Sequence, residues 1–153
     1  MRKLIWAGML AAVGMACADD DPPSRVARLN LVEGSVSLQS SGHEDWSEAV
    51  VNYPLTTGDR LWADENSHAE LHIGSAAIRL DSHTAVAFLN LDDRMTQVRL
   101  SDGTINITIR HLDNDESYEI DTPNGAVTLL RPGKYRIDAD PDRETTTVTV
   151  RAG

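Results

Sequence analysis

Residues 69–80, AELHIGSAAIRL, decide the fold class of this chain. Apolar residues occupy every second position in two runs within it, 69–73 and 76–80. Side chains of a β-strand point alternately to the two faces of a sheet, so a period of two predicts strands with one buried face. An amphipathic helix would repeat its apolar residues every three to four positions instead. The stretch therefore predicts two half-buried β-strands.

The same period continues in both directions along the chain. It recurs in residues 27–31, 105–109, 135–139 and 146–150. Turn-forming residues separate these stretches, at Gly34, Gly58-Asp59, Ser101-Asp102-Gly103, Pro123-Asn124-Gly125 and Pro132-Gly133. No window keeps an apolar stripe at helical spacing for three turns. Because one-faced strands must bury their apolar side against another sheet, we expect an all-β sandwich, jelly roll or barrel of ten or more short strands.

Length and charge narrow the class of protein further. The chain has 153 residues, of which 41% are hydrophobic and 25% charged, as in a single soluble domain. Its 14 basic residues face 24 acidic ones, and the formal net charge is −10. Such a charge repels nucleic acid and anionic lipid headgroups, so neither is an expected partner.

The first 18 residues, MRKLIWAGMLAAVGMACA, have the basic start, apolar run and small-residue exit of a secretory signal. Their apolar run is shorter than the about 20 residues that a membrane-spanning helix needs. We expect cleavage before Asp19, which leaves a mature chain without a transmembrane segment and without its one cysteine, Cys17. The alternative is a lipid anchor at Cys17, although Gly14 stands where that motif normally has a bulky aliphatic residue.

These features divide the chain into three parts. Residues 1–18 are the predicted signal peptide, residues 19–25 form an acidic, proline-containing spacer, and residues 26–153 form the β domain. The predicted location is periplasmic or secreted.

Two predicted strands depart from simple alternation. Residues 84–91, TAVAFLNL, are apolar on both faces, which fits either a central strand covered on each side or an exposed partner-binding patch. Thr145, Thr147 and Thr149 form a hydroxyl face, which suits β geometry and requires no ligand.

A metal site at His68, Glu70 and His72 is disfavoured by strand geometry. The three side chains would share one strand face. With a rise of about 3.3 Å per residue, the two histidines lie about 13 Å apart, too far to bind one ion. We therefore interpret these residues as a solvated strand face.

A calcium loop at Asp138, Asp140 and Asp142 is disfavoured by the residues that follow. Arg143 stands where the loop requires glycine, and Thr149 stands where it requires a bidentate glutamate. An acidic hairpin turn fits this segment better. No metal or cofactor is expected.

Catalytic signatures are not found in the sequence. It has no Gly-x-Ser-x-Gly elbow and no phosphate-binding glycine loop, and His43, His83 and His111 have no nucleophile at a recognisable spacing. We expect a protein that is not an enzyme and assign no catalytic, cofactor or metal residue. A saccharide-stacking surface stays open as an alternative, built from the aromatic residues of the mature chain, Trp46, Trp62, Tyr53, Tyr118, Tyr135 and Phe88.

From Pro54 onward the chain resembles a known family. The matching phrases are PLTTGDRL (54–61), AELHIGSAAIRLDS (69–82), VRLSDG (98–103), EIDTPNGAV (119–127) and PGKYRID (132–138). In this order they resemble the FecR-type domain, named for the periplasmic regulator of ferric citrate uptake. The upstream phrase LVEGSV (31–36) resembles the strand pair that leads into such domains.

The resemblance implies a jelly-roll-like β-sandwich of short, mostly antiparallel strands. The turn residues Gly58-Asp59 and Gly103 would lie where hairpins reverse, and Pro123 would end a strand. Leucine and isoleucine residues of the matching phrases would point inward, at Leu61, Leu71, Ile78 and Leu80. These phrases define a fold and not an active site.

The resemblance also implies binding or signal relay outside the inner membrane. Family members that regulate sigma factors carry a cytoplasmic segment and a membrane helix before this domain, where this chain has its predicted signal peptide. The first hypothesis is an exported, non-enzymatic module that binds another envelope protein through a strand edge or an apolar patch. The second is a module that binds an envelope glycan or saccharide. The third, a transmembrane anti-sigma regulator, would require residues 1–18 to stay attached.

The C-terminal strand is the expected binding edge. In FecR-like domains the strand matching Thr145 to Arg151 is usually followed by a glycine turn and one more short strand, whereas this sequence ends at Gly153. The resemblance therefore implies a domain truncated at its C-terminal end. One hypothesis is that the open edge pairs with a strand from a partner, from a second copy or from a further C-terminal part of the same protein. The alternative is that the threonine face and nearby charges keep the edge solvated and the protein monomeric.

Overall fold

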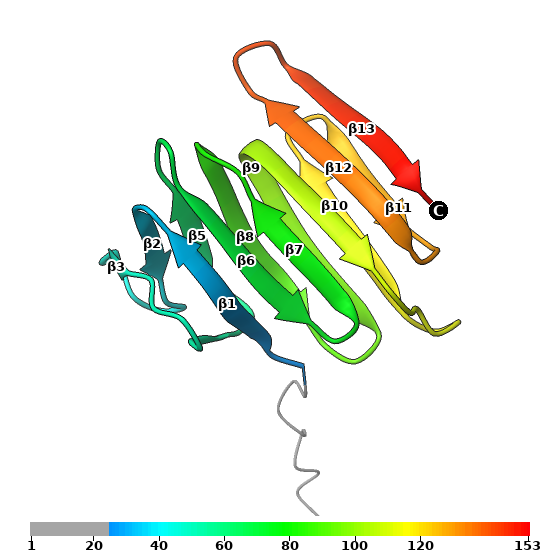
Figure 1. The fold of residues 1–153 in the computed structure, drawn as a ribbon, viewed down its shortest axis with the longest axis horizontal. Helices are drawn as coiled ribbons and strands as arrows, with labels where there is room; N and C mark the ends of the chain where they lie inside the picture. The colour runs from blue at the N-terminus through cyan, green and yellow to red at the C-terminus, as the bar shows by residue number, and fades with distance from the viewer. Residues whose placement is uncertain (1–24) are drawn as a thin grey trace, which may run out of the picture.

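The computed structural model describes residues 25–153, which form 13 β-strands and contain no helix (Figure 1). The all-β prediction is confirmed for this part of the chain. The predicted signal peptide, residues 1–18, and all but the last residue of the predicted spacer, residues 19–25, lie outside the described residues.

The strands vary from two to fifteen residues in length. In chain order they are β1 (Ala27–Glu33), β2 (Val36–Gln39), β3 (Ser47–Glu48), β4 (Pro54–Leu55), β5 (Arg60–Ala63), β6 (His68–Ile73), β7 (Ala76–Leu80), β8 (Thr84–Leu91), β9 (Met95–Ile109), β10 (Ser117–Thr122), β11 (Gly125–Leu129), β12 (Gly133–Asp140) and β13 (Thr145–Ala152).

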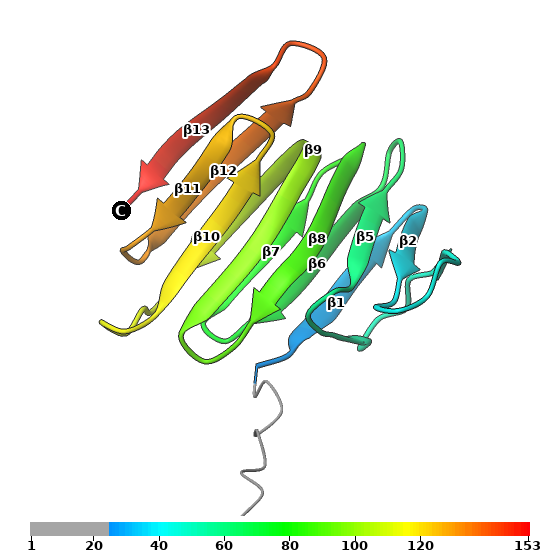
Figure 2. The same cartoon turned by 180° about the vertical axis from the view of Figure 1, so that it is seen from behind.

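The strands form two layers that share β9. In one layer, here the front sheet, the order is β4-β1-β6-β7-β9-β12-β13; in the other, the back sheet, it is β3-β2-β5-β8-β9-β10-β11. The front sheet faces the viewer in Figure 1 and the back sheet in Figure 2. All neighbours pair antiparallel except β9 and β10, which are parallel. The predicted β-sandwich of mostly antiparallel strands is confirmed.

The long strand β9 passes from the back sheet to the front sheet. Residues 96–102 pair with β8, and residues 103–109 pair with β12 and, over their second part, with β7. The predicted hairpin turn at Ser101-Asp102-Gly103 is therefore wrong, because the strand continues through it. Gly103 has φ +91°, and a Cβ there would lie 2.3 Å from the carbonyl oxygen of His83. An Asp-Gly pair that suits a turn equally suits this bend within a strand.

The core lies between the two sheets and is built from the predicted inward faces. Leu61, Leu71, Ile78 and Leu80 are all at most 1% exposed. Larger side chains fill the space between the layers, with Phe88 and Tyr118 each 1% exposed. Pro123 follows the last residue of β10, as predicted.

A β-bulge changes the predicted face of Leu31. The pairing of β1 with β6 shifts register between Leu29 and Leu31, so Leu31 is 41% exposed while Val32 packs against the core. The period of two predicted Leu31 to be buried, which is wrong because the extra residue reverses the alternation.

Strand β8 is central, but only one of its faces is covered by the other sheet. It lies between β5 and β9, with Val86 and Phe88 in the core. On the opposite face Ala85 and Ala87 are half-buried and line a hollow in the outer surface of the back sheet. The interpretation of residues 84–91 as a strand covered on each side is therefore wrong for this outer face.

Candidate functional site

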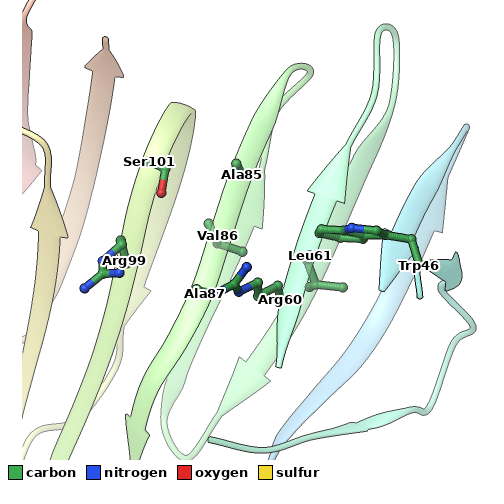
Figure 3. A pocket seen from close by; sticks show the side chains of 8 residues that line it. All are labelled: Trp46, Arg60, Leu61, Ala85, Val86, Ala87, Arg99 and Ser101. Atoms are coloured by element: carbon green, nitrogen blue, oxygen red, sulfur yellow. The ribbon is translucent and has the colours of Figure 1, made fainter. Parts of the chain in front are cut away.

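The outer face of the back sheet carries two adjoining hollows, together called the tryptophan hollow. One has a volume of about 350 Å³ and is lined by Trp46, Arg60, Leu61, Ala85, Val86, Ala87, Arg99 and Ser101 (Figure 3). The other has a volume of about 310 Å³ and is lined by Ser37, Trp46, Trp62 and Ala85. The two hollows meet at Trp46 and Ala85, so the indole of Trp46 borders both.

Strand alternation places most of these side chains on the outer face. In β5 the core residue Leu61 separates Arg60 from Trp62, and both of these neighbours point outward. In β8 the small residues Ala85 and Ala87 form the floor between β5 and β9. Because alanine ends at Cβ, the taller tryptophan and arginine side chains around it leave a depression.

Trp46 reaches the hollow from the segment before β3, which a buried carboxylate helps to hold. The Asp59 side chain accepts hydrogen bonds from the backbone N–H of Ser41, at 2.7 Å, and of Thr56, at 2.9 Å. Asp59 is 2% exposed and lies in the Gly58-Asp59 turn, which forms where the sequence predicted it. The hairpin expected at this turn is wrong, because β4 pairs with β1 in the front sheet whereas β5 pairs with β2 and β8 in the back sheet. The side chain of Gln39 donates to the carbonyl oxygen of Glu44, at 2.8 Å, and anchors the same segment. Asp59 and Gln39 therefore help to hold the segment that carries Trp46.

The lining of the tryptophan hollow contains two basic side chains, Arg60 and Arg99. Arg60 pairs across the sheet with Ala87, and Ala87 pairs with Arg99, so the two arginines flank one alanine. Neither forms an ion pair with an acidic side chain in residues 25–153, and the lining residues of both hollows include no carboxylate. The site thus combines two indoles, two guanidinium groups and hydroxyl groups of serine.

A second candidate surface is the end of the sandwich where β11 and β13 lie. Figures 1 and 2 show these two edge strands together at the end opposite to β2 and β3. Among the strands of residues 25–153, β13 pairs with β12 alone, and β11 pairs with β10 alone. Val148 and Val150 pair with core residues of β12 and share their inward face, yet they are 41% and 59% exposed. The structure confirms Thr145–Ala152 as an edge strand.

Between these strands lies a groove of about 270 Å³, here called the edge groove. Its lining residues are Thr122, Asn124, Gly125, Ala126, Val127, Thr146 and Val148. The hydroxyl of Thr146 lies 2.9 Å from the hydroxyl of Thr122 and 3.1 Å from the side-chain oxygen of Asn124. The side-chain amide of Asn124 donates to the carbonyl oxygen of Glu144, at 2.8 Å. These contacts join the tips of two hairpins, one from each sheet.

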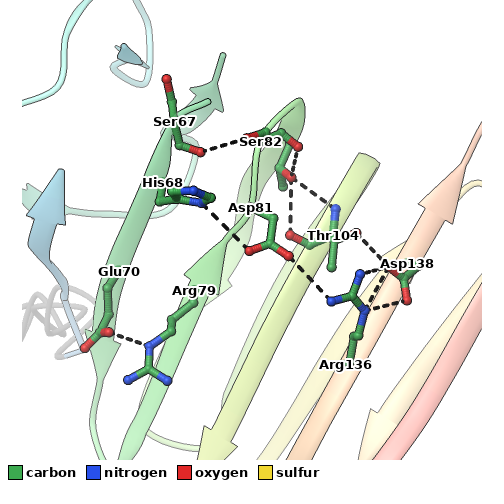
Figure 4. Close-up of polar contacts among 10 residues, drawn as sticks. Ser67, His68, Glu70, Arg79, Asp81, Ser82, Thr104, Arg136 and Asp138 are labelled. Carbon is green, nitrogen blue, oxygen red and sulfur yellow. Dashed lines mark hydrogen bonds and ion pairs between the residues drawn. The ribbon is translucent and has the colours of Figure 1, made fainter. Parts of the chain in front are cut away.

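The predicted shared face of His68, Glu70 and His72 is confirmed on the outside of β6, where Figure 4 shows His68 and Glu70. Glu70 accepts hydrogen bonds from Arg79, at 2.6 Å, and pairs with His72 at 2.9 Å. These two partners lower the pKa of the Glu70 carboxyl below its ordinary value. His68 approaches Asp81 instead, at 3.9 Å. In residues 25–153 no group of three or more histidine, cysteine or acidic side chains is arranged to hold a metal ion.

The three aspartates of the calcium-loop match have separate surroundings. Asp138 binds Arg136 at 2.8 Å and the hydroxyl of Thr104 at 2.6 Å, on the outer face of β12 (Figure 4). Burial raises its pKa, but the hydrogen bonds from Arg136 and Thr104 outweigh burial, and the pKa is lowered. Asp140 accepts a hydrogen bond from the backbone N–H of Arg143 at the hairpin turn. Asp142 lies exposed in that turn, as an acidic hairpin predicts.

Other titratable side chains have structural partners. The Arg25 guanidinium donates to Glu116, and this hydrogen bond is the largest cause that lowers the pKa of the Glu116 carboxyl. Burial raises the pKa of Tyr118, whose hydroxyl donates to the carbonyl oxygen of Ile73 at 3.0 Å. The ring of His83 meets Trp62 edge-on, at 6.1 Å between ring centroids, and His111 pairs with Asp113 at 2.8 Å.

Sequence reasoning named Trp46 and Trp62 among six aromatic residues, assigned neither to a site, and missed Arg60 and Arg99. No local signal marks these arginines, because their position beside the tryptophans depends on the order of β5, β8 and β9 in the back sheet. The position of β11 and β13 on either side of the edge groove likewise depends on how both sheets end.

Residues 25–153 contain no helix that is long and apolar enough to span a membrane. Comparison with known proteins adds one finding: the model of the FecR family, described as FecR protein, matches residues 59–153. No curated protein and no solved structure matches the chain. The matched region contains β5 to β13, including both edge strands and most of the tryptophan hollow. The chain therefore belongs to the FecR family.

Proposed function

We propose that this chain is an exported, non-catalytic binding module of the cell envelope, which relays a signal by pairing its edge strand β13 with a strand of another envelope protein. The observation that carries the proposal is the exposed edge beside the edge groove. There, the inward-facing valines Val148 and Val150 of an eight-residue strand remain 41% and 59% exposed. An uncovered strand edge with apolar side chains on one face is a template for strand addition.

The lengths of the edge strands favour this end of the sandwich. At the opposite end the edges are β3 and β4, which have two residues each. At this end the edges are β11, with five residues, and β13, with eight. Very short edge strands protect a sheet against pairing, whereas a longer one can form a full ladder.

Charge favours a foreign partner over a second copy. The hairpin tip beside the edge groove carries Asp140, Asp142 and Glu144 against one basic residue, Arg143. Two copies of a chain with a net charge of −10 would bring these acidic tips together, which like-charge repulsion opposes. The proposed partner is an extended segment with apolar residues at alternating positions and basic residues beside them.

The non-catalytic part of the proposal is supported by the titratable groups. The carboxyl groups of Glu70, Glu116 and Asp138 have lowered pKa values, and each is hydrogen-bonded to an arginine that holds it in the framework of the domain. Shifted groups in an active site would instead be expected to converge on a hollow. Export is supported by residues 1–18, and intact mass of the secreted product, with Asp19 as its first residue, tests it. An acylated Cys17 would contradict the predicted cleavage site and favour the lipid anchor.

Site-specific photo-crosslinking in the native host tests the edge-strand proposal. A photoreactive residue at Val150 should form an adduct with another protein, whereas the same residue at Ser47, in the short edge strand β3, should not. The added variant Val148→Asp should abolish the adduct, because it places a charge on the apolar face of β13. Adducts of equal yield at both positions, or only adducts with the mass of two copies of this chain, would contradict the proposal.

A further inference from the structure

The geometry points to a binding site for an acidic saccharide, one that carries a carboxylate on a sugar ring, in the tryptophan hollow. The site is independent of the edge groove, because it lies on the outer face of the back sheet and shares no residue with that groove. Its two parts provide different chemistry, and they meet at Trp46 and Ala85.

The smaller part suits the apolar face of a sugar ring. Trp46 and Trp62 line it together over Ala85, and its one hydroxyl-bearing residue is Ser37. A sugar with equatorial substituents presents axial C–H groups on its faces and hydroxyl groups around its rim. An indole covers such a face without removing the rim hydroxyls from water, which avoids the cost of burying unpaired polar groups.

The way in which both tryptophans are held supports a stacking role. Trp62 is fixed by its strand and by its edge-on contact with His83. Trp46 is 49% exposed, although the segment that carries it is held by the buried Asp59. A large apolar side chain that is exposed yet anchored loses little conformational freedom when a ligand covers it.

The larger part suits a carboxylate. Arg60 and Arg99 flank Ala87 in one cross-strand row, which places their Cα atoms about 10 Å apart at a strand spacing of about 4.8 Å. Guanidinium groups on both sides of the small floor residue can donate to one carboxylate or to neighbouring hydroxyls. Ser101 adds a hydroxyl on the β9 side (Figure 3).

Charge complementarity selects an acidic ligand over a neutral one. Within residues 25–153 no acidic side chain lines either part of the hollow, although Asp102 pairs with Ala85 and Asp121 with Arg99 across the sheet. By contrast, Arg25, Arg79 and Arg136 are each paired with a carboxylate. Arg60 donates to the side-chain oxygen of Gln39, at 3.5 Å, but neither Arg60 nor Arg99 is paired with a carboxylate within residues 25–153, so both can bind an anionic ligand.

An open hollow on a flat sheet face also favours a saccharide over an apolar small molecule. Apolar ligands gain affinity by losing most of their surface to an enclosed cavity. Here the two hollows lie side by side on the outer surface of the back sheet and would leave one face of the ligand in water. A sugar chain with hydroxyl groups on its outer rim tolerates that exposure.

Titration of the purified chain with a tetrasaccharide of hyaluronan, which alternates glucuronate and N-acetylglucosamine, tests the inference. Chitotetraose, a neutral sugar of the same length, is the first control ligand, and tetraglutamate, an acidic peptide, is the second. Fluorescence of Trp46 and Trp62 and isothermal titration calorimetry report binding. The hyaluronan fragment should bind at least about tenfold more tightly than chitotetraose, because charge-assisted hydrogen bonds are lost with the neutral sugar. This preference should weaken as salt is raised.

Variants separate the two parts of the site. Trp46→Ala should weaken binding of both sugars about tenfold, as expected for the loss of one stacking surface. Combined Arg60→Gln and Arg99→Gln should remove the preference for the acidic sugar while keeping the affinity for chitotetraose. Arg131→Gln and Leu130→Ala, at exposed positions outside the hollow, should bind like the unmodified chain. Thermal unfolding of each variant shows that it remains folded.

Three outcomes would overturn the inference. The first is no binding of the hyaluronan fragment at about 10 mM, which is weaker than a specific site would give. The second is binding that survives both the Trp46→Ala and the double arginine variant. The third is tetraglutamate binding as tightly as the acidic sugar, which would show a site for an acidic peptide. None of these outcomes affects the edge-strand proposal, which the Val150 adduct tests separately.

Discussion

Gly103 is the residue on which the two-sheet arrangement depends. It lies where β9 changes from pairing with β8 to pairing with β12, and its φ of +91° is one that other residues adopt only with strain. Beside it, the hydroxyl of Thr84 contacts the backbone of Thr104 through two hydrogen bonds, at 3.0 Å and 3.2 Å. The side-chain hydroxyl thus satisfies backbone groups at the bend, where the sheet ladder is interrupted.

Gly103→Ala should lower the free energy of unfolding by about 3 kcal/mol or more, since it combines backbone strain with overpacking. The new Cβ would lie 2.3 Å from the carbonyl oxygen of His83 and 2.4 Å from the hydroxyl of Thr84. Urea denaturation measures the loss. Gly42→Ala is the control, because Gly42 has a φ of +76° but no atom within 4 Å of the added Cβ. Equal losses in the two variants would show that the close contacts at Gly103 relax without cost.

The ion pair of Arg25 and Glu116 makes stability depend on pH. Both side chains are largely buried, with 16% and 13% of their surface exposed. Because the folded pKa of the Glu116 carboxyl is lowered, the unfolded chain takes up a proton first as the pH falls. The stabilisation is therefore complete above the unfolded pKa of glutamate and is lost as the pH drops through the folded pKa.

Glu116→Gln should lower the free energy of unfolding by about 1 kcal/mol at pH 7. The difference from the unmodified chain should shrink as the pH falls below about 4.5. Thermal unfolding at a series of pH values from neutral to acidic measures both effects. Glu65→Gln, at an exposed glutamate, should behave like the unmodified chain throughout. A difference that stays constant down to the lowest pH would show that the ion pair is not its cause.

At the scale of elements, the edge strands are held by side chains as well as by their sheets. Strand β13 has a ladder on one side alone, so the contacts of Thr146 with Thr122 and Asn124 are its link to the other layer near the hairpin tips. The predicted hydroxyl face of Thr145, Thr147 and Thr149 points outward, opposite to the edge groove. Strand β13 therefore has a solvated threonine face and an inner face whose side chains contact the β10–β11 hairpin of the other sheet.

Thr146→Val should increase amide hydrogen exchange over residues 145–152, because it removes the hydroxyl that joins the hairpins while keeping the side-chain shape. The expected loss of local stability is about 1 kcal/mol, or roughly a fivefold faster exchange. Hydrogen exchange followed by mass spectrometry measures it. Thr149→Val, on the exposed outer face of the same strand, is the matched control. Similarly faster hydrogen exchange in both variants would show that strand propensity sets the exchange rate, and not the hydrogen bonds of Thr146 with Thr122 and Asn124.

At the scale of the whole molecule, β9 makes the two sheets one cooperative unit. Leu100 contributes to the core from the part of β9 in the back sheet, and Ile107 from the part in the front sheet. Neither sheet can lose β9 without losing its central strand, so the layers cannot separate while both stay paired. This shared strand also fixes the back-sheet neighbours that carry the tryptophan hollow relative to the edge groove.

Leu100→Ala and Ile107→Ala should each lower the free energy of unfolding by about 2–5 kcal/mol, as expected for large cavities in a packed core. Each variant should still unfold in a single transition. Tryptophan fluorescence, which within the described residues reports on Trp46 and Trp62, and far-UV circular dichroism should give the same urea midpoint. Two separate midpoints in either variant would show that the sheets unfold independently.

Local patterns explain why much of the fold could be predicted. The alternation in residues 69–80 and 105–109 is a property of neighbouring residues, so it predicted β6, β7 and the second part of β9 without knowledge of the sheet. The series of phrases from Pro54 onward predicted the family. Errors arose where one residue changes the geometry: the bulge that exposes Leu31, and the bend at Gly103 that replaces a turn.

The sequence by itself determined the β-strands, the inward faces and the FecR family, because each follows from short-range order along the chain. Only the tertiary structure decided which distant residues share a surface. Trp46 and Arg99 line one hollow because β5, β8 and β9 are neighbours, and Val148 is exposed because the back sheet ends at β11. Strand order and sheet ends depend on long-range pairing, which the period of two along each strand does not encode.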